Sequence, residues 1–156
     1  MTTTTTTTTT TKSSVVLPLL DEHEILRCPN CNYDTGYTLG NLPKDNLEHT
    51  CSNCNTVVEI IVQRGTISVT QSNINQGVER SPSSCPVALA FRRSGYINIA
   101  VCSDKIVFDS VGNKGNCITY TPREVKVFMN IFDKFDREKP APFTFDFVAL
   151  SRRVGK

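Results

Sequence analysis

The chain has 156 residues, of which 38% are apolar and 21% are charged. These proportions are typical of a soluble globular protein with one ordinary domain or two small ones. No stretch reaches the roughly 18 consecutive apolar residues that a membrane-spanning helix needs, and the N-terminus lacks the basic start and the long apolar run of a signal peptide. We therefore expect a cytoplasmic protein, in which paired cysteines hold metal more often than they form disulfides.

The net charge of +2 conceals an uneven distribution. Between residues 21 and 72, seven acidic side chains stand against three basic ones, whereas between residues 73 and 156 thirteen basic side chains stand against eight acidic ones. Because lysine and arginine supply most of the affinity for a phosphate backbone, the first half is poorly suited to nucleic acid. The second half has to be considered separately.

The chain begins with a low-complexity tract, ten threonines from Thr2 to Thr11. Such a tract has nothing to bury, so ordering it would cost backbone entropy without compensation. We expect residues 1–22 to form a disordered tail.

Residues 23–72 contain the sequence Cys-x-x-Cys-Asn twice, at Cys28-Pro29-Asn30-Cys31-Asn32 and at Cys51-Ser52-Asn53-Cys54-Asn55. Four thiolates suit the tetrahedral geometry of zinc, and the spacer of 19 residues is within the range of zinc modules. The asparagine that closes each turn tolerates the positive φ expected there. The pattern predicts that Cys28, Cys31, Cys51 and Cys54 bind one structural Zn2+.

Other uses of these cysteines stay open. An iron site uses the same four sulfurs, but the aromatic shell expected around it is thin, because only Tyr33 and Tyr37 lie nearby in the sequence. Disulfide-bonded loops and a redox-active Cys-x-x-Cys motif are further alternatives. Strand-forming residues follow each pair, which disfavours the redox motif, and four cysteines leave no open position for a catalytic water. His23 and His49 are interpreted as surface polar residues, with substitute or second-sphere ligation as the alternative.

Short strands are expected on both sides of the turns: residues 33–39 forming a hairpin with 47–50, then residues 56–62 turning at Gln63-Arg64-Gly65 into 66–70. This arrangement resembles the zinc-ribbon superfamily over residues 23–72. Many ribbons of the transcription machinery bind nucleic acid. The acidic character of this segment, and the lack of the adjacent Asp-Glu pair that transcript-cleavage ribbons carry, favour a protein-binding ribbon instead.

Residues 73–84 are polar and rich in turn formers, which predicts a linker. Residues 85–150 predict a small β-meander plus helix domain, with strands at 87–91, 96–102, 106–108 and 117–120 and a final strand in which Phe143, Phe145 and Phe147 alternate. Ile97, Ile99 and Val101 are expected on one face. The predicted fold class is mainly β (small α+β): a zinc ribbon followed by an antiparallel meander with one C-terminal helix.

The helix is expected to begin at Thr121-Pro122-Arg123-Glu124, with a capping box between Thr121 and Glu124. Its apolar face would contain Val125, Phe128, Met129, Ile131, Phe132 and Phe135. The opposite side carries a basic stripe of Arg123, Lys126, Lys134 and Arg137, bordered by Asp133 and Asp136 and extended by the basic tail 151–156. This stripe is either a solvated surface or a face for nucleic acid or an acidic partner.

The remaining cysteines, Cys85, Cys102 and Cys117, lack paired spacing and are expected to be buried free thiols. No histidine lies beyond residue 49, so the second domain cannot contain a Cys/His or Ser/His catalytic pair. With no phosphate-binding loop either, the sequence argues against an enzyme.

Three segments carry a second resemblance: Cys85-Pro86-Val87-Ala88, then Ile99-Ala100-Val101-Cys102-Ser103-Asp104-Lys105, then Ile118-Thr119-Tyr120-Thr121-Pro122-Arg123-Glu124-Val125 with Phe128. They resemble the actinobacterial domain-of-unknown-function family numbered 397, over about residues 84–135. The family's opening tryptophan stretch is absent, and Val125 stands where its helix has tryptophan. The resemblance implies a small binding partner of a transcription regulator and no catalytic residues.

These observations together predict a non-enzymatic regulatory or adaptor protein with a structural Zn2+, which binds a protein partner linked to transcription. Two alternatives remain. One is direct nucleic-acid binding through the basic helix face, and the other is a viral structural or host-takeover protein.

Overall fold

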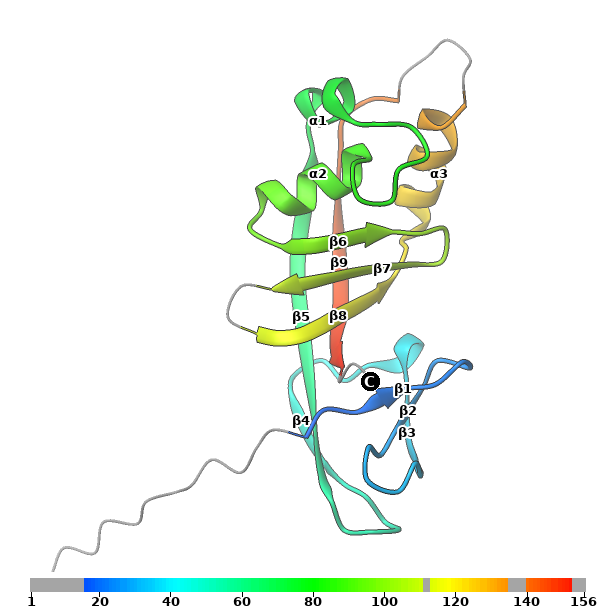
Figure 1. Ribbon diagram of the computed structural model, residues 1–156, viewed down its shortest axis with the longest axis vertical. Helices are drawn as coiled ribbons and strands as arrows, with labels where there is room; N and C mark the ends of the chain where they lie inside the picture. Colours follow the sequence, from blue (N-terminus) through cyan, green and yellow to red (C-terminus); the bar gives the residue numbers. More distant parts are fainter. Residues whose placement is uncertain (1–15, 111–112, 135–139, 153–156) are drawn as a thin grey trace, which may run out of the picture.

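A computed structural model describes residues 16–110, 113–134 and 140–152 of the chain. The described part has a small sheet, a larger sheet and three α-helices (Figure 1). The small antiparallel sheet has the order β1 (Leu19–Leu20), β2 (Ile25–Arg27), β3 (Asp34–Thr38). The larger antiparallel sheet has the order β4 (Leu47–Thr50), β5 (Val57–Val69), β9 (Phe143–Arg152), β8 (Asn113–Tyr120), β7 (Lys105–Ser110), β6 (Ile97–Val101).

The predicted mainly β, small α+β class is confirmed, but the described residues form three α-helices rather than one. They are α1 (Gln71–Gln76), α2 (Pro86–Arg93) and α3 (Arg123–Phe132), and a 3-10 turn, η1, covers Leu39–Asn41.

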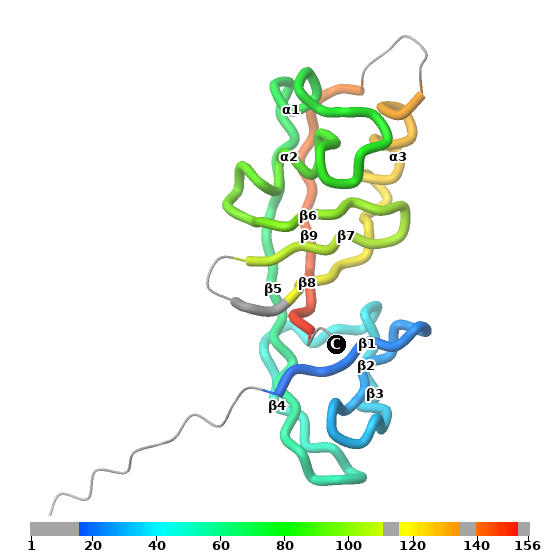
Figure 2. Tube along the Cα trace, in the orientation of Figure 1, coloured from blue at the N-terminus to red at the C-terminus, as the bar shows by residue number. Residues whose placement is uncertain are grey.

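The long strand β5 connects the two halves of the molecule. Its first part pairs with β4 and its second part, from Ile61 to Val69, pairs with β9. Figures 1 and 2 show β5 and β9 running along the long axis between the small sheet and the helices. The turn predicted at Gln63-Arg64-Gly65 is therefore wrong. Gly65 is needed for close packing, because a Cβ atom there would lie 2.7 Å from the ring of Phe147.

The hairpin predicted between residues 33–39 and 47–50 is also wrong. Strand β3 pairs with β2, and β4 pairs with β5. Each Cys-x-x-Cys turn therefore closes its own hairpin, and the sequence repeat is a structural repeat.

Residues 87–91, predicted as a strand, belong to helix α2. Two start signals explain the helix: Pro86 occupies its first turn, and Cys85 is its N-cap, with Sγ accepting a hydrogen bond of 3.4 Å from the Ala88 amide. Phe91 of α2 is fully buried and packs against the rings of Phe108 and Phe147. Helix α2 thus covers the larger sheet and supplies the centre of its core.

Two segments expected to lie outside the domains are part of the fold. Helix α1 extends into the predicted linker 73–84, and its Ile74 is buried in the main core. Within the predicted tail 1–22, strand β1 pairs with β2, and the Val16 carbonyl accepts a hydrogen bond from the Glu59 amide at 2.9 Å. The threonine tract itself lies outside the described residues.

Helix α3 begins without the predicted capping box. Pro122 is its N-cap and no side chain caps it, because the Thr121 hydroxyl donates instead to the Cys102 carbonyl at 2.9 Å. The buried face is confirmed at Val125, Phe128 and Phe132, and Met129 is partly buried against the same core. Ile131, expected on that face, is 42% exposed, and Phe135 lies outside the described residues.

Strand β6 contains a bulge. Ile99 and Val101 are buried as expected, but Ile97 is 49% exposed. The register shifts between Ile97 and Ala100, where Asn98 has a φ of 52°. The extra residue moves Ile97 out of phase with the inward-facing positions.

A second core cluster holds the two halves together. Leu26, Leu39 and Ile60 from the cysteine-containing half pack with Ile118 and Leu150 from the other half. Division of the chain into a ribbon at 23–72 and a second domain at 85–150 stays a prediction, but the halves share both a sheet and a core. None of the helices in the described residues is long and apolar enough to cross a membrane.

Candidate metal centre

The two cysteine turns have the same backbone geometry. Asn32 and Asn55 adopt φ values of 62° and 59°, as their sequence position predicts. In the first turn the Asn32 amide donates to the Cys28 carbonyl at 2.8 Å, and in the second the Asn55 amide donates to the Cys51 carbonyl at 2.9 Å. The backbone therefore presents both sulfur pairs in the same way.

The four cysteine side chains converge on one point. Their Sγ atoms all lie within 4.8 Å of one another. The closest pairs join the two turns: Cys28 to Cys54 at 3.6 Å and Cys31 to Cys51 at 3.5 Å. A zinc tetrahedron with Zn–S bonds of about 2.3 Å has sulfurs about 3.8 Å apart, whereas a disulfide needs about 2.05 Å. Cys28, Cys31, Cys51 and Cys54 could thus hold one metal ion, and no disulfide joins them.

Each turn contributes one inner and one outer sulfur. Cys28 and Cys51 are buried and pack with Val58, whereas Cys31 and Cys54 are only partly buried. Desolvation raises the pKa of the Cys28 thiol to about 11. On the outer side, the Thr56 hydroxyl is the main cause that lowers the pKa of Cys54 to about 5. Metal binding at neutral pH must therefore displace a proton from the inner position.

Asn30 and Asn53, which the sequence analysis does not single out, each bond to the outer sulfur of the opposite turn. The Asn53 side chain of the second turn bonds Cys31 of the first and is the main cause that lowers the pKa of Cys31. Asn30 of the first turn bonds Cys54 of the second and also lowers its pKa. The signal was present, since the repeat reads Cys-x-Asn-Cys-Asn in full.

Thr56 completes this polar shell. Its Oγ1 accepts a hydrogen bond from Asn30 Nδ2 at 3.1 Å and lies 3.1 Å from Cys54 Sγ. Because the Asn30 side-chain amide donates to Thr56 Oγ1, the hydroxyl proton of Thr56 is free to point at a Cys54 thiolate. Such second-sphere donors orient metal ligands and tune their basicity.

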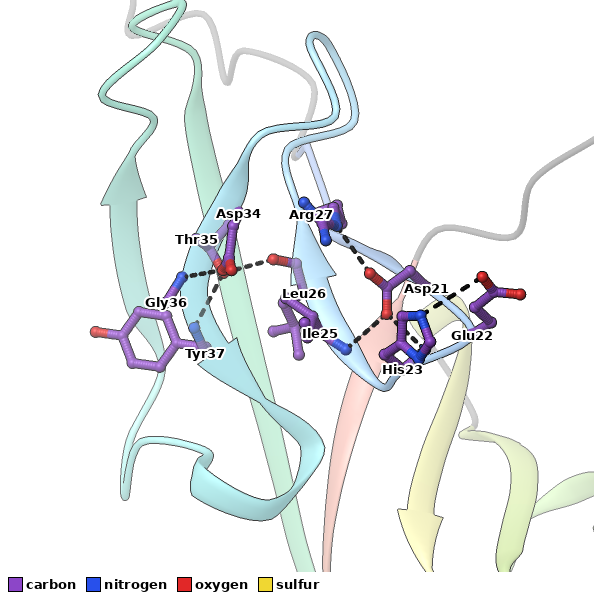
Figure 3. A network of polar contacts seen from close by, with 10 residues as sticks. All are labelled: Asp21, Glu22, His23, Ile25, Leu26, Arg27, Asp34, Thr35, Gly36 and Tyr37. Carbon is purple, nitrogen blue, oxygen red and sulfur yellow. Dashed lines mark hydrogen bonds and ion pairs between the residues drawn. The ribbon is translucent and has the colours of Figure 1, made fainter.

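The first turn is fixed by a polar network at its base (Figure 3). The Asp21 carboxylate accepts from the Ile25 amide at 2.9 Å and pairs with Arg27, whose Nε lies 2.8 Å away and holds the pKa of Asp21 low. On the other side of β2, the Thr35 hydroxyl donates to the Leu26 carbonyl at 2.8 Å. These bonds fix β2 immediately before Cys28.

Neither histidine lies in the sulfur cluster of the described residues. His23 is exposed beside Glu22 at 3.6 Å, and the ring of His49 packs edge-on against Tyr37. The interpretation of both as ordinary polar residues fits their positions.

Three members of the predicted basic stripe lie within the described residues. Arg123, Lys126 and Lys134 are exposed on or just after α3, whereas Arg137 lies outside the described residues. Lys126 lines a cavity of about 230 Å³ with Cys102, and Arg123 lines a separate groove.

The three unpaired cysteines differ in burial. Cys85 and Cys117 are buried as predicted, and desolvation raises the pKa of both thiols. Cys102 is exposed, so the prediction for it is wrong. It follows the last residue of β6, where the chain turns toward β7.

Comparison of the chain with protein-family models, with curated proteins and with solved structures finds no match. The resemblances to zinc ribbons and to family 397 thus stay predictions, and function has to be argued from the site itself.

Proposed function

We propose that the protein is a non-enzymatic adaptor whose Cys28, Cys31, Cys51 and Cys54 bind one structural Zn2+. The observation that carries the proposal is the convergence of four Sγ atoms within 4.8 Å of one another from two turns of the same geometry. Zinc is favoured over iron because the surroundings of the sulfurs are polar: Asn30, Asn53 and Thr56 contact them. Tyr33, the aromatic residue nearest in sequence to the first turn, is 49% exposed.

A structural role follows from the ligand count. Four thiolates fill the tetrahedron, so no coordination position is left for a reacting water. The ion would instead fix the tips of the β2–β3 and β4–β5 hairpins to each other. Neither hairpin makes a large core of its own, and small modules of this kind commonly depend on metal for their fold.

The adaptor role is supported by the charge of the metal-binding half. Seven acidic residues against three basic ones, together with four thiolates on one Zn2+, repel a phosphate backbone. The partner is therefore proposed to be a protein, and its link to transcription rests on the resemblance to family 397. Direct binding of nucleic acid through α3 is the alternative.

Partner capture with the full chain tests this function. Tagged wild-type protein and the Cys28→Ser variant are used as baits in extracts with and without nuclease. We expect a protein partner that survives nuclease and is lost with Cys28→Ser, while Cys102→Ser, a matched thiol outside the site, retains it. Loss of all partners on nuclease treatment would replace the adaptor with the nucleic-acid alternative.

A further inference from the structure

Helix α3 has an outward face that the core does not use. At 100° per residue, Arg123, Val127 and Ile131 of α3 fall within about 80° of one another, and Lys134 follows two residues after the helix ends at Phe132. All four are exposed, with Val127 at 51% and Ile131 at 42%. Along the chain, the two exposed apolar residues therefore have one exposed cation before them, Arg123, and one after them, Lys134.

Val127 lines a groove. The groove has a volume of about 560 Å³ and lies between α3 and the beginning of β9, lined by Arg123, Glu124, Val127, Phe128, Ala141, Phe143 and Thr144. The rings of Phe128 and Phe143 lie 4.6 Å apart. Val127 therefore continues an apolar floor rather than standing alone, and the exposed apolar surface reaches from the groove along the helix to Ile131.

We propose that this face of α3 docks a short amphipathic acidic segment of the protein partner. The inference rests on the proposed adaptor function and names its contact surface. Its basis is charge complementarity: cations at both ends of an apolar pair select a segment with two apolar side chains in the middle and a carboxylate beyond each. Because ten helical residues span about 15 Å, the two carboxylates must be separated by a similar distance.

Other occupants fit the face less well. A nucleic-acid backbone presents closely spaced phosphates and needs a run of cations, but here the exposed apolar residues Val127 and Ile131 stand between Arg123 and Lys134. A second copy of the chain would place like charges of two α3 faces near each other. A segment with both acidic and apolar side chains can contact the apolar pair and pair with both cations.

A synthetic peptide tests the proposal. The probe is a helical 15-mer (about the length of α3 with its flanks) with one tryptophan and one leucine four residues apart and a glutamate one turn outside each. Because the protein contains no tryptophan, the peptide fluorescence reports binding to the zinc-loaded full chain. We expect saturable binding that weakens at high salt, and at least tenfold weaker binding for the same peptide with lysine in place of glutamate.

Matched variants locate the site. Val127→Glu should weaken binding at least tenfold, whereas Ile97→Glu, at an equally exposed position of β6 (49%), should leave it unchanged. Arg123→Glu should weaken binding while Lys44→Glu does not. Equal affinity for the two peptides, no binding at millimolar protein, or an oligonucleotide that displaces the peptide would each overturn the proposal. If a nuclease-resistant partner is captured equally by Val127→Glu and Ile97→Glu, this docking face is wrong and the adaptor function stands.

Discussion

At the scale of single residues, the most informative positions are the asparagines that close the cysteine turns. Asn32 and Asn55 have φ values near 60°, a region that costs an ordinary L-residue roughly 1–2 kcal/mol. Asparagine tolerates this conformation and glycine has no such cost. The positive φ of each cysteine turn therefore explains why asparagine is found at positions 32 and 55.

The first prediction concerns Asn55. Replacement by valine should lower the free energy of unfolding by about 1–2 kcal/mol, because a β-branched residue is strained at positive φ. Asn55→Gly should cost little. Denaturant unfolding of the metal-loaded proteins measures both, and an equal loss for the two variants would contradict a backbone origin of the effect.

The second prediction concerns Thr56 and the pKa of Cys54. With the cysteine turns folded, the Thr56 hydroxyl is the main cause that lowers the pKa of Cys54 from 9.0 to about 5. Because the pKa is lower in the folded state, its contribution to stability is complete above pH 9 and is lost as the pH falls through 5. Thr56→Val should raise this pKa toward that of an ordinary thiol.

Ultraviolet absorbance of the thiolate, followed against pH, measures the change. Thr56→Ser is the control, since it keeps the hydroxyl and should keep the low pKa. If valine and serine give the same titration curve, the hydroxyl is not the donor.

At the scale of elements, strand β5 determines how the two halves meet. It pairs with β4 at one end and with β9 along the rest of its length. Gly65 lies where β5 passes the ring of Phe147, which is itself enclosed by Phe91, Phe108 and Tyr96. The ring therefore cannot move aside without displacing its neighbours.

The third prediction follows from this contact. Gly65→Ala should destabilise the protein by about 1–3 kcal/mol, because the new methyl group overlaps the Phe147 ring. Gly40→Ala is the matched control, since its Cβ would meet only ordinary contacts at 3.6 Å and 3.7 Å. Thermal unfolding of the two variants compares them, and equal midpoints would show that β5 and β9 do not approach as closely as described.

The elements also show what the sequence could and could not predict. Local chemistry is sufficient to predict the cysteine turns, strands β3, β7 and β9, and the burial of Val125, Phe128 and Phe132 in α3. It failed at α2, where Val87 to Phe91 form an apolar run that suits a buried strand or a buried helix equally. Pro86 and the Cys85 cap indicate a helix, whereas the prediction of a strand rests on the apolar run alone.

Pairing partners could not be obtained from local patterns. Nothing in residues 33–39 says that they pair with residues 25–27 rather than with 47–50, since both arrangements bury the same alternation. The role of Gly65 cannot be obtained from local patterns either. Next to Gln63 and Arg64, Gly65 indicates a turn. The structure shows instead that the backbone at Gly65 lies close to the ring of Phe147, which is 82 residues later in the chain. Asn30 and Asn53, in contrast, could have been found from the repeat.

At the scale of the whole molecule, the cysteine cluster and the large core are separate parts of the structure. The main core lies between the larger sheet and its helices, whereas the buried apolar residue that packs with the sulfur cluster is Val58. The cluster of Leu26, Leu39 and Ile60 with Ile118 and Leu150 connects them. Removal of metal should therefore loosen one half more than the other.

The fourth prediction tests this division by hydrogen exchange. After chelation, amides of β2, β3 and β4 should exchange much faster, while those of β7 and β8 keep most of their protection. The Cys28→Ser variant should reproduce the pattern without chelator. A uniform rise across both sheets would mean that the protein unfolds as one cooperative unit when the metal is lost.

The central claim is that Cys28, Cys31, Cys51 and Cys54 together bind one Zn2+. Native mass spectrometry with elemental analysis of the purified full chain tests it most directly. We predict one zinc per chain in the wild type and in Cys102→Ser, and no retained metal in Cys28→Ser or Cys54→Ser. A wild-type protein that binds no zinc when zinc is supplied in excess, or one that carries iron in place of zinc, would contradict the account.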